Sequence, residues 1–187
     1  MTDKTKQMIL DAALKIFSQK GYKAANIKDM AKKAGFNEKT IYRRFKTKKN
    51  LYNMVLLTNL EKFKLDLGRY VFVDKKFETP TDFFEYSIKI TAKVFWDNFE
   101  FFYISINEQN EIIEGTMEEV NDFVGFYIEQ NIPNLNIDYK IFGFSIANFI
   151  YRVSLERYLG GTYLDYDEFI DRFTKYCIQF VSTIQNP

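Results

Sequence analysis

The 187-residue chain contains no histidine, one cysteine, three prolines and eight glycines. Without histidine it cannot build a Ser-His-Asp triad, a Cys-His pair or a His-ligated metal site. The single Cys177 cannot form an intrachain disulfide, and the apolar helical pattern around it predicts an inert core thiol. These absences argue against an enzyme, and we expect no cofactor and no metal.

Long apolar runs and Gly-rich loops are also missing. No apolar run approaches the roughly 18 residues that a membrane span requires, and the polar N-terminus does not resemble a signal peptide, so we expect a cytoplasmic protein. Gly160 and Gly161 stand alone and indicate a helix stop rather than a phosphate loop. The acidic run at 111–122 favours a solvated helix start over a metal site.

Positive charge is abundant at one end of the chain. Residues 1–51 hold fourteen Lys and Arg against four acidic residues, whereas the remainder holds twelve against twenty-one. The nearly neutral total therefore hides a polarised chain, whose first part attracts polyanions and whose second part repels them.

Residues 26–48 have the pattern of two short helices joined by a tight turn. The first helix is predicted over 27–34, with Asn26 as its N-cap and Gly35 at its end. The second is predicted over 38–45 and is capped by Asn37. Any small helical bundle contains such a pair, but the charge favours a helix-turn-helix whose second helix enters a DNA major groove.

The predicted DNA-binding surface lies on this motif. We expect one group of residues to contact phosphates and another to contact base edges, and we also expect Asn37, at the start of the second helix, to contact the DNA. The phosphate group is Asn26, Thr40, Tyr42, Arg43 and Lys48, and the base-edge group is Lys28, Glu38, Lys39 and Arg44.

The first third of the chain resembles, without gaps, the DNA-binding domain of the TetR (tetracycline repressor) family. The matching residues are Ala13, Phe17, Gly21, Ala31, Ala34, Gly35, Thr40, Ile41, Tyr42, Phe45, Lys48 and Leu51. Asn replaces the family's usual Thr or Ser at 26 and Ser at 37, which keeps both caps, and Ala25 lacks a common hydroxyl. The resemblance implies a transcriptional regulator, most often a repressor, that dimerises through its last two long helices.

The whole chain is predicted to be all-α. A helix over 4–20 ending at Gly21 completes a three-helix headpiece (residues 1–47), and a helix over 48–69, capped by Thr47, links it to a body (48–187) for ligand binding and dimerisation. In the body a loop is expected over 70–78 and a short aromatic segment over 99–107. Helices are expected from the Thr79 cap to 98, from a Thr116–Glu119 capping box to 131, over 137–159, and from the Asp165 cap to 184.

The last two helices are apolar on more than one face. Such helices need two partners, so we expect a homodimer through them, with a fully buried pair in a monomer as the alternative. Core packing explains most of the 26 aromatic residues after position 70, but one cluster predicts a cavity for an apolar or flat ligand. The predicted ligand-binding residues are Trp96, Phe99, Phe102, Tyr103, Phe123, Tyr127, Phe149 and Arg152, although Arg152 also fits an ion pair with Glu156.

The sequence thus predicts a DNA-binding regulator released from a near-palindromic operator on double-stranded DNA by a small effector. One alternative is an interaction or ligand-binding protein of the same architecture without sequence-specific DNA binding. A helical lipid or ligand carrier is another, but it gives no reason for the basic headpiece.

Overall fold

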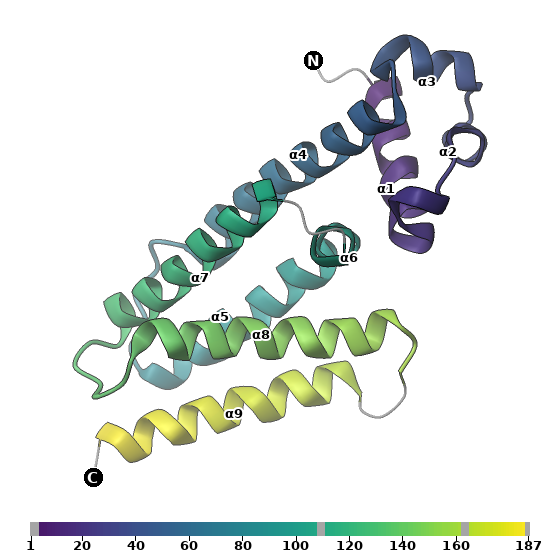
Figure 1. Ribbon diagram of the computed structural model, residues 1–187. Coiled ribbons are helices and arrows are strands. Elements are labelled where there is room, and N and C mark those ends of the chain that lie inside the picture. Colours follow the sequence, from purple (N-terminus) through teal and green to yellow (C-terminus); the bar gives the residue numbers. More distant parts are fainter. Residues whose placement is uncertain (1–3, 108–110, 162–164, 186–187) are drawn as a thin grey trace. The chain divides into compact units, whose positions relative to one another are not determined.

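The computed structural model describes residues 4–107, 111–161 and 165–185, and the regular structure within these ranges is helical throughout (Figure 1). The all-α prediction is therefore confirmed. The elements are α1 (Lys4–Ala24), α2 (Ile27–Ala34), α3 (Glu38–Phe45), α4 (Lys48–Asp66), the π-helical segment η1 (Leu67–Val71), α5 (Pro80–Asp97), α6 (Phe99–Asn107), α7 (Glu111–Asn131), α8 (Tyr139–Tyr158) and α9 (Tyr166–Gln185).

The helices form two compact units. The first contains α1, α2, α3, α4 as far as Phe63, and α6 from Glu100 onward. The second contains the end of α4 with η1, and α5, α7, α8 and α9. The division between the two units differs from the expected domain boundary between residues 47 and 48, because most of α4 and most of α6 belong to the same unit as the headpiece. None of the described helices is both long enough and apolar enough to cross a membrane.

Local hydrogen bonds fix several helix ends where the sequence predicts them. Thr79 and Asp82 form a reciprocal capping box at the start of α5, and the Asp165 carboxylate accepts from the Glu168 N–H at the start of α9. Gly21 interrupts α1 with φ 71°, and one further turn follows it. The linking helix ends at Asp66 and changes into the π-helical η1 instead of continuing as an α-helix to 69.

One prediction for the body was wrong. Helix α7 starts by Glu111, so that Thr116 lies inside a helix and not at its cap, whereas the aromatic segment over 99–107, for which no secondary structure was specified, is the helix α6. A glycine inside a helix costs only about 1 kcal/mol, so Gly115 does not stop the helical hydrogen bonding that surrounds it. The helix at 137–159 begins two residues later than predicted, because Asp138 caps it through the Ile141 N–H.

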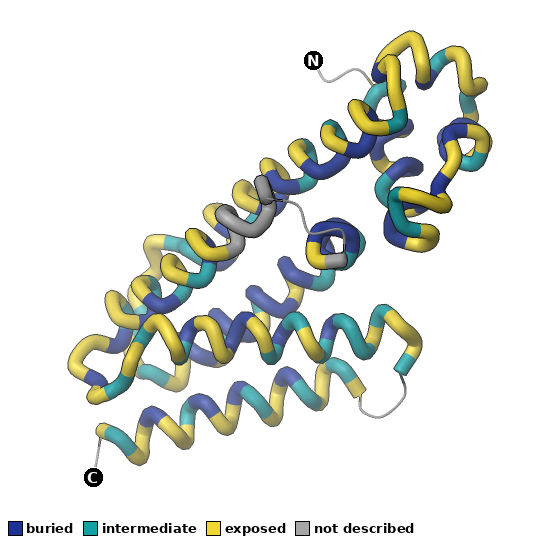
Figure 2. The backbone as a smooth tube through the Cα atoms, in the orientation of Figure 1, coloured by how far each residue is buried: buried dark blue, intermediate teal, exposed yellow. Residues whose placement is uncertain are grey.

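Helix α5 supplies much of the core of the second unit. Phe83, Phe84, Ile88, Ala92 and Phe95 are buried along it, and it packs on α8, α9 and η1. Figure 2 shows this helix with long buried stretches, whereas α9 alternates between buried and exposed positions. Cys177 lies in α9, and burial raises the pKa of its thiol to about 12, which is consistent with the predicted inert core thiol.

Helices α7 and α8 approach closely at two glycines. A Cβ atom added at Gly125 would lie 2.7 Å from the Tyr139 carbonyl oxygen, and one added at Gly143 would lie 2.7 Å from the Gly125 nitrogen. The backbone of α7 therefore packs directly against that of α8 at Gly125 and Gly143.

Replacing Gly125 by Ala is expected to lower the free energy of unfolding. Its methyl group meets backbone atoms, which must shift, and such overpacking costs about 1–3 kcal/mol. Urea unfolding followed by circular dichroism measures the change. Gly68→Ala is the matched control, because no atom lies within 4 Å of the added Cβ. Equal midpoints for both variants would contradict the close approach.

Candidate nucleic-acid interface and cavity

The two-helix motif has the predicted bounds and caps. Asn26 Oδ1 accepts a hydrogen bond from the Asp29 N–H at 2.8 Å, and Asn37 Oδ1 accepts from the Thr40 N–H at 2.9 Å. Between them Gly35 has φ 76°, and the Phe36 N–H donates to the Ala31 carbonyl at 2.9 Å. Each cap satisfies N–H groups that the helix itself leaves free, which is why the motif could be delimited from the sequence.

Helix α3 buries one face and exposes the other. Ile41 and Phe45 are buried and seat the helix, together with Met30 and Ala34 of α2. Most of the predicted DNA-binding residues are exposed: Asn26, Lys28, Asn37, Glu38, Lys39, Tyr42, Arg43 and Arg44. The structure thus brings the predicted set together around α3 and the start of α2.

The side chains of Thr40 and Lys48, two predicted DNA contacts, donate hydrogen bonds within the first unit. The Thr40 hydroxyl donates to Asn37 Oδ1 at 3.0 Å. The Lys48 ammonium donates to the Lys23 carbonyl at 3.2 Å and lies 4.7 Å from the centre of the Tyr22 ring. Both residues are half-buried, and Lys48 connects the start of α4 to the end of α1.

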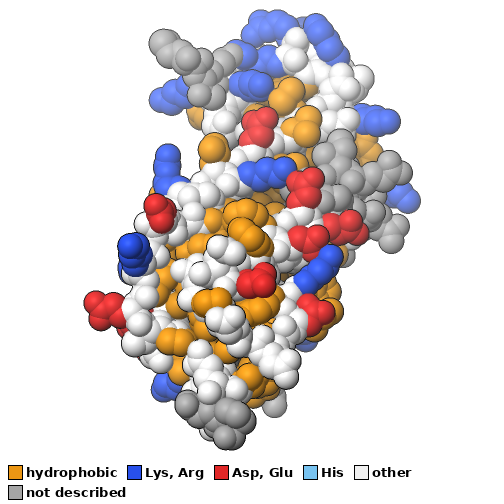
Figure 3. Space-filling view, turned by 90° about the vertical axis from the view of Figure 1, so that its left-hand side faces the viewer, with side chains coloured by type: hydrophobic (Ala, Val, Ile, Leu, Met, Phe, Trp, Pro, Cys, Tyr) orange, Lys and Arg blue, Asp and Glu red, His pale blue; other side chains and the backbone are white. Residues whose placement is uncertain are grey.

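Little negative charge offsets the cations of the headpiece. In Figure 3 Lys and Arg side chains crowd its surface with few acidic ones among them. The Asp29 carboxylate is paired with Lys20 at 2.6 Å, and this hydrogen bond lowers the pKa of Asp29. The exposed surface of α3 is therefore basic.

One carboxyl group from outside the headpiece belongs to the same unit. Burial raises the pKa of Glu100 at the start of α6, and the charges of Lys15 and Lys33 partly offset this effect by lowering it. Helix α6 therefore places an acidic group within the electrostatic range of two headpiece lysines.

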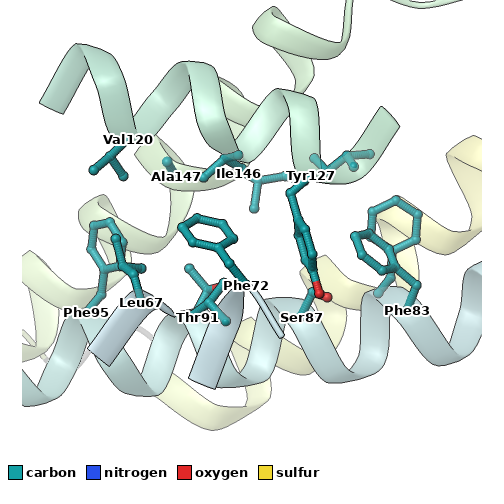
Figure 4. A pocket seen from close by; sticks show the side chains of 14 residues that line it. Leu67, Phe72, Phe83, Ser87, Thr91, Phe95, Val120, Tyr127, Ile146 and Ala147 are labelled. Carbon is teal, nitrogen blue, oxygen red and sulfur yellow. The ribbon is translucent and has the colours of Figure 1, made fainter. Parts of the chain in front are cut away.

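The second unit contains an apolar cavity of about 30 Å³. Helices α5, α7 and α8 form its walls with η1 and the residue after it, and Figure 4 shows Tyr127 reaching from α7 towards Ser87 on α5. The lining residues are Leu67, Val71, Phe72, Phe83, Phe84, Ser87, Thr91, Phe95, Val120, Val124, Tyr127, Ile128, Ile146 and Ala147.

Few polar groups line this cavity. The Tyr127 hydroxyl donates to the Val73 carbonyl at 3.2 Å, and burial raises the pKa of Tyr127. The buried Ser87 hydroxyl has no hydrogen-bond partner among the described residues. Since a buried hydroxyl without a partner is costly, Ser87 is a ready anchor for a guest in the cavity.

The free space is small because aromatic rings fill most of it. Phe72 meets the Tyr127 ring edge-on with the ring centres 5.3 Å apart, and Phe83 lies 5.6 Å from the same ring. A space of about 30 Å³ holds one or two water-sized guests. A larger ligand therefore requires these rings or their helices to move.

The structure does not bring the eight predicted ligand-binding residues together. Tyr127 lines the cavity, and Phe123 packs beside it on Phe72. The other six lie elsewhere. Trp96 and Phe99 stack on each other, and Phe149 stacks on Phe173. Phe102 packs on Phe63 in the first unit, where Tyr103 is half-buried, and Arg152 pairs with Glu156 on the surface. Helical periodicity could not tell which side each ring faces.

Sequence reasoning also missed residues that line the cavity. Ser87 and Thr91 are four positions apart along α5, so they share one face. That spacing was visible in the sequence, but small polar residues in such a stripe carry no sign of a cavity. The contribution of η1 depends on the change from α-helix to π-helix, which no local motif indicates.

The fold and the basic motif define a helix-turn-helix DNA-binding regulator. Residues 9–55 match the family model described as "Bacterial regulatory proteins, tetR family". YvkB of Bacillus subtilis, an uncharacterised helix-turn-helix-type transcriptional regulator, is 44% identical over 52 residues, which are 28% of this chain and 28% of YvkB. YhgD of the same organism, described in the same words, is 28% identical over 142 residues, covering 69% of this chain and 70% of YhgD.

Solved structures extend the likeness to the whole fold. AibR, crystallised with isovaleryl coenzyme A and operator DNA, has a TM-score of 0.69 at 14% identity, covering 91% of this chain and 96% of AibR. By these comparisons residues 9–55 are a TetR-family DNA-binding segment, and the fold of the chain is that of TetR-like regulators.

Proposed function

We propose that the protein is a repressor that binds a near-palindromic operator as a homodimer and is released by a small apolar or aromatic effector. The observation that carries this proposal is the position of η1. It follows α4 directly, and its residues Leu67 and Val71 line the cavity of the second unit. Helix α4 begins at Lys48, immediately after the headpiece. An effector in the cavity would therefore act on η1, a segment that α4 connects to the DNA-binding motif.

The exposed face of α3 supports the DNA-binding part of the proposal. Arg43 and Tyr42 are exposed and suit phosphate contacts, while Lys28, Glu38, Lys39 and Arg44 suit base edges. The alternative, a TetR-like interaction or ligand-binding protein without sequence-specific DNA binding, gives these exposed cations no role. Operator binding would also place the protein in the cytoplasm.

The outer faces of α8 and α9 support the dimer. Ile141 and Phe144 of α8 are 60% and 47% exposed, and Tyr176 and Phe180 of α9 are 62% and 36% exposed. On α9 the ring of Phe173 stacks near Tyr176 and that of Tyr176 near Phe180, and we call these rings together with the exposed side chains of α8 the apolar row. A second copy of this helix pair would cover the row and form a four-helix bundle about a two-fold axis.

The cavity supports an apolar effector with few polar groups. Its lining is aromatic and aliphatic, and Ser87 supplies an unpaired hydroxyl. Because the space is too small for such a ligand, the effector would bind a form with an enlarged cavity and shift the population towards it. In a two-fold dimer the recognition helices must sit about 34 Å apart, so a small tilt of α4 lowers operator affinity. The ligand and DNA bound to AibR show that one protein of this fold holds both kinds of partner.

Operator binding should depend on salt and on individual α3 cations. Each neutralised phosphate contributes about −0.9 to the slope of log K against log salt, so Arg43→Ala should weaken all duplexes and reduce the slope by about one unit. Lys39→Ala should instead change base preference at one position by about 1–3 kcal/mol. Gel shifts on DNA upstream of the chain's own gene measure both effects.

Lys76→Ala is the control for this experiment, because it removes an exposed lysine from the second unit. It should leave operator affinity unchanged. An affinity that stays flat from low to moderate salt would rule out the proposed DNA contacts.

The dimer should separate when its apolar row carries a charge. Phe144→Arg places an unpaired cation in the proposed interface, where desolvation has no compensation, so sedimentation velocity should show monomers at micromolar concentration. Leu65→Arg is the matched control, because Leu65 is 70% exposed on α4 and lies outside α8 and α9. A dimeric Phe144→Arg protein, or a wild-type monomer, would contradict the interface.

Effector binding and operator binding should oppose each other by one common factor. Flat apolar probes such as indole and naphthalene are titrated with and without operator. A coupling of about 1–3 kcal/mol corresponds to a 5- to 150-fold loss of affinity, and linkage requires the same ratio in both directions. Ala147→Phe should fill the cavity and abolish probe binding. Equal probe affinities with and without operator would show that the cavity does not control DNA binding.

A further inference from the structure

A second and larger depression lies on another face of α5. Its volume is about 310 Å³, and it is formed by α5, the end of α8 and the beginning of α9. It shares no lining residue with the apolar cavity, because α5 turns Ser87 and Thr91 towards the cavity and Lys89 and Lys93 towards this cleft. The cleft is therefore a separate site, and a ligand can occupy it whether or not the apolar cavity holds an effector.

Two aromatic rings hold the guanidinium group of Arg157 in the cleft. Its Cζ atom lies 4.2 Å from the centre of the Trp96 ring and 4.7 Å from that of the Tyr166 ring. Both rings are themselves fixed. Trp96 stacks on Phe99 at 6.0 Å, and the Tyr166 hydroxyl donates to the Ala92 carbonyl at 3.1 Å. Arg157 is thus positioned before any ligand arrives, which lowers the entropy cost of binding.

Arg157 differs from the two lysines of the cleft because it has no carboxylate partner among the described residues. Lys89 is paired with Asp171 at 2.8 Å, and Lys93 is paired with Asp97. Within the described part of the chain, no carboxylate forms a salt bridge with Arg157 and no acceptor takes a hydrogen bond from its side chain. The ring contacts take no hydrogen bond from the guanidinium group, so its N–H groups stay available to a planar oxyanion.

The charge of the lining limits the kind of anion. Lys89, Lys93 and Arg157 contribute three positive charges, and Asp167 and Asp171 contribute two negative ones. Since Asp171 balances Lys89 and Asp97 balances Lys93, only the positive charge of Arg157 is left without an ion pair, which matches a monoanion, and Asp167 and Asp171 would repel a polyphosphate. Ala92 and Ile170 add apolar surface to the same cleft.

We propose that this cleft binds a small monocarboxylate with an apolar tail. The carboxylate accepts two parallel hydrogen bonds from the Arg157 guanidinium, and the tail lies against Ala92, Ile170 and the edge of Trp96. The cleft volume is near the lower limit of small-molecule sites, which suits a ligand of this size.

The test uses hexanoate as the probe and hexanamide, its neutral analogue, as the matched ligand control. Trp96 is the only tryptophan in the chain, so tryptophan fluorescence reports on this cleft, and calorimetry gives an independent affinity. Hexanoate should produce a saturable change, and hexanamide should not. Arg157→Gln should weaken hexanoate binding by at least about tenfold. The hexanoate affinity of Arg157→Lys should lie between those of the wild type and Arg157→Gln, because lysine keeps the positive charge but cannot donate two parallel hydrogen bonds.

Two further variants locate the binding. Arg172→Gln removes an arginine of α9 that pairs with Glu168 at 3.2 Å outside the cleft, so hexanoate affinity should stay unchanged. Ala147→Phe blocks the apolar cavity and should also leave hexanoate binding intact. Loss of binding in Ala147→Phe would assign the probe to the cavity and overturn the proposal.

The remaining outcomes also decide the question. Equal affinities for hexanoate and hexanamide, no saturable change, or wild-type affinity in Arg157→Gln would each overturn it. Arg157 would then serve only to clamp α8 to α5 and α9, and Arg157→Gln would lower the unfolding midpoint without changing the binding of any carboxylate.

Discussion

The unbroken backbone of α4 is the constraint on which the proposed regulation depends. The helix runs without interruption from Lys48 to Asp66, a length of about 28 Å at 1.5 Å per residue. Its early residues Leu51, Val55 and Leu56 are buried in the first unit, and the η1 segment that continues it lines the cavity of the second. The π-helical geometry of η1 places a less regular turn at the point where a guest would act.

Helix α5 organises the second unit in a comparable way. One face carries Ser87, Thr91 and Phe95 into the apolar cavity, and another carries Lys89, Lys93 and Trp96 into the charged cleft. The two sites differ in chemistry, since one has an apolar lining with a single unpaired hydroxyl and the other has a fixed guanidinium group.

Aromatic residues serve four purposes in this body, and their number alone did not separate them. Phe99 is buried in the core, Phe72, Phe83 and Tyr127 narrow the cavity, and Tyr176 and Phe180 stay exposed on α9. Trp96 belongs to none of these groups, because it positions a cation. The composition predicted a cavity, but the rings that close it were chosen by the way helices cross, including the close contact of Gly125 with Gly143.

The sequence alone determined the features that depend on neighbours within a few positions. The bounds of α2 and α3, the caps at Asn26 and Asn37 and the left-handed Gly35 follow from hydrogen bonds between residues three to five apart, and all were predictable. The basic surface of the headpiece followed in the same way, because the side of α3 opposite Ile41 and Phe45 has to be exposed. Only the tertiary structure decided the early start of α7, the unpaired Ser87, the scattering of Trp96, Phe102 and Phe149, and the cleft around Arg157. These features depend on which faces of distant helices meet, and the 3.6-residue period that reveals an apolar stripe does not specify its partner.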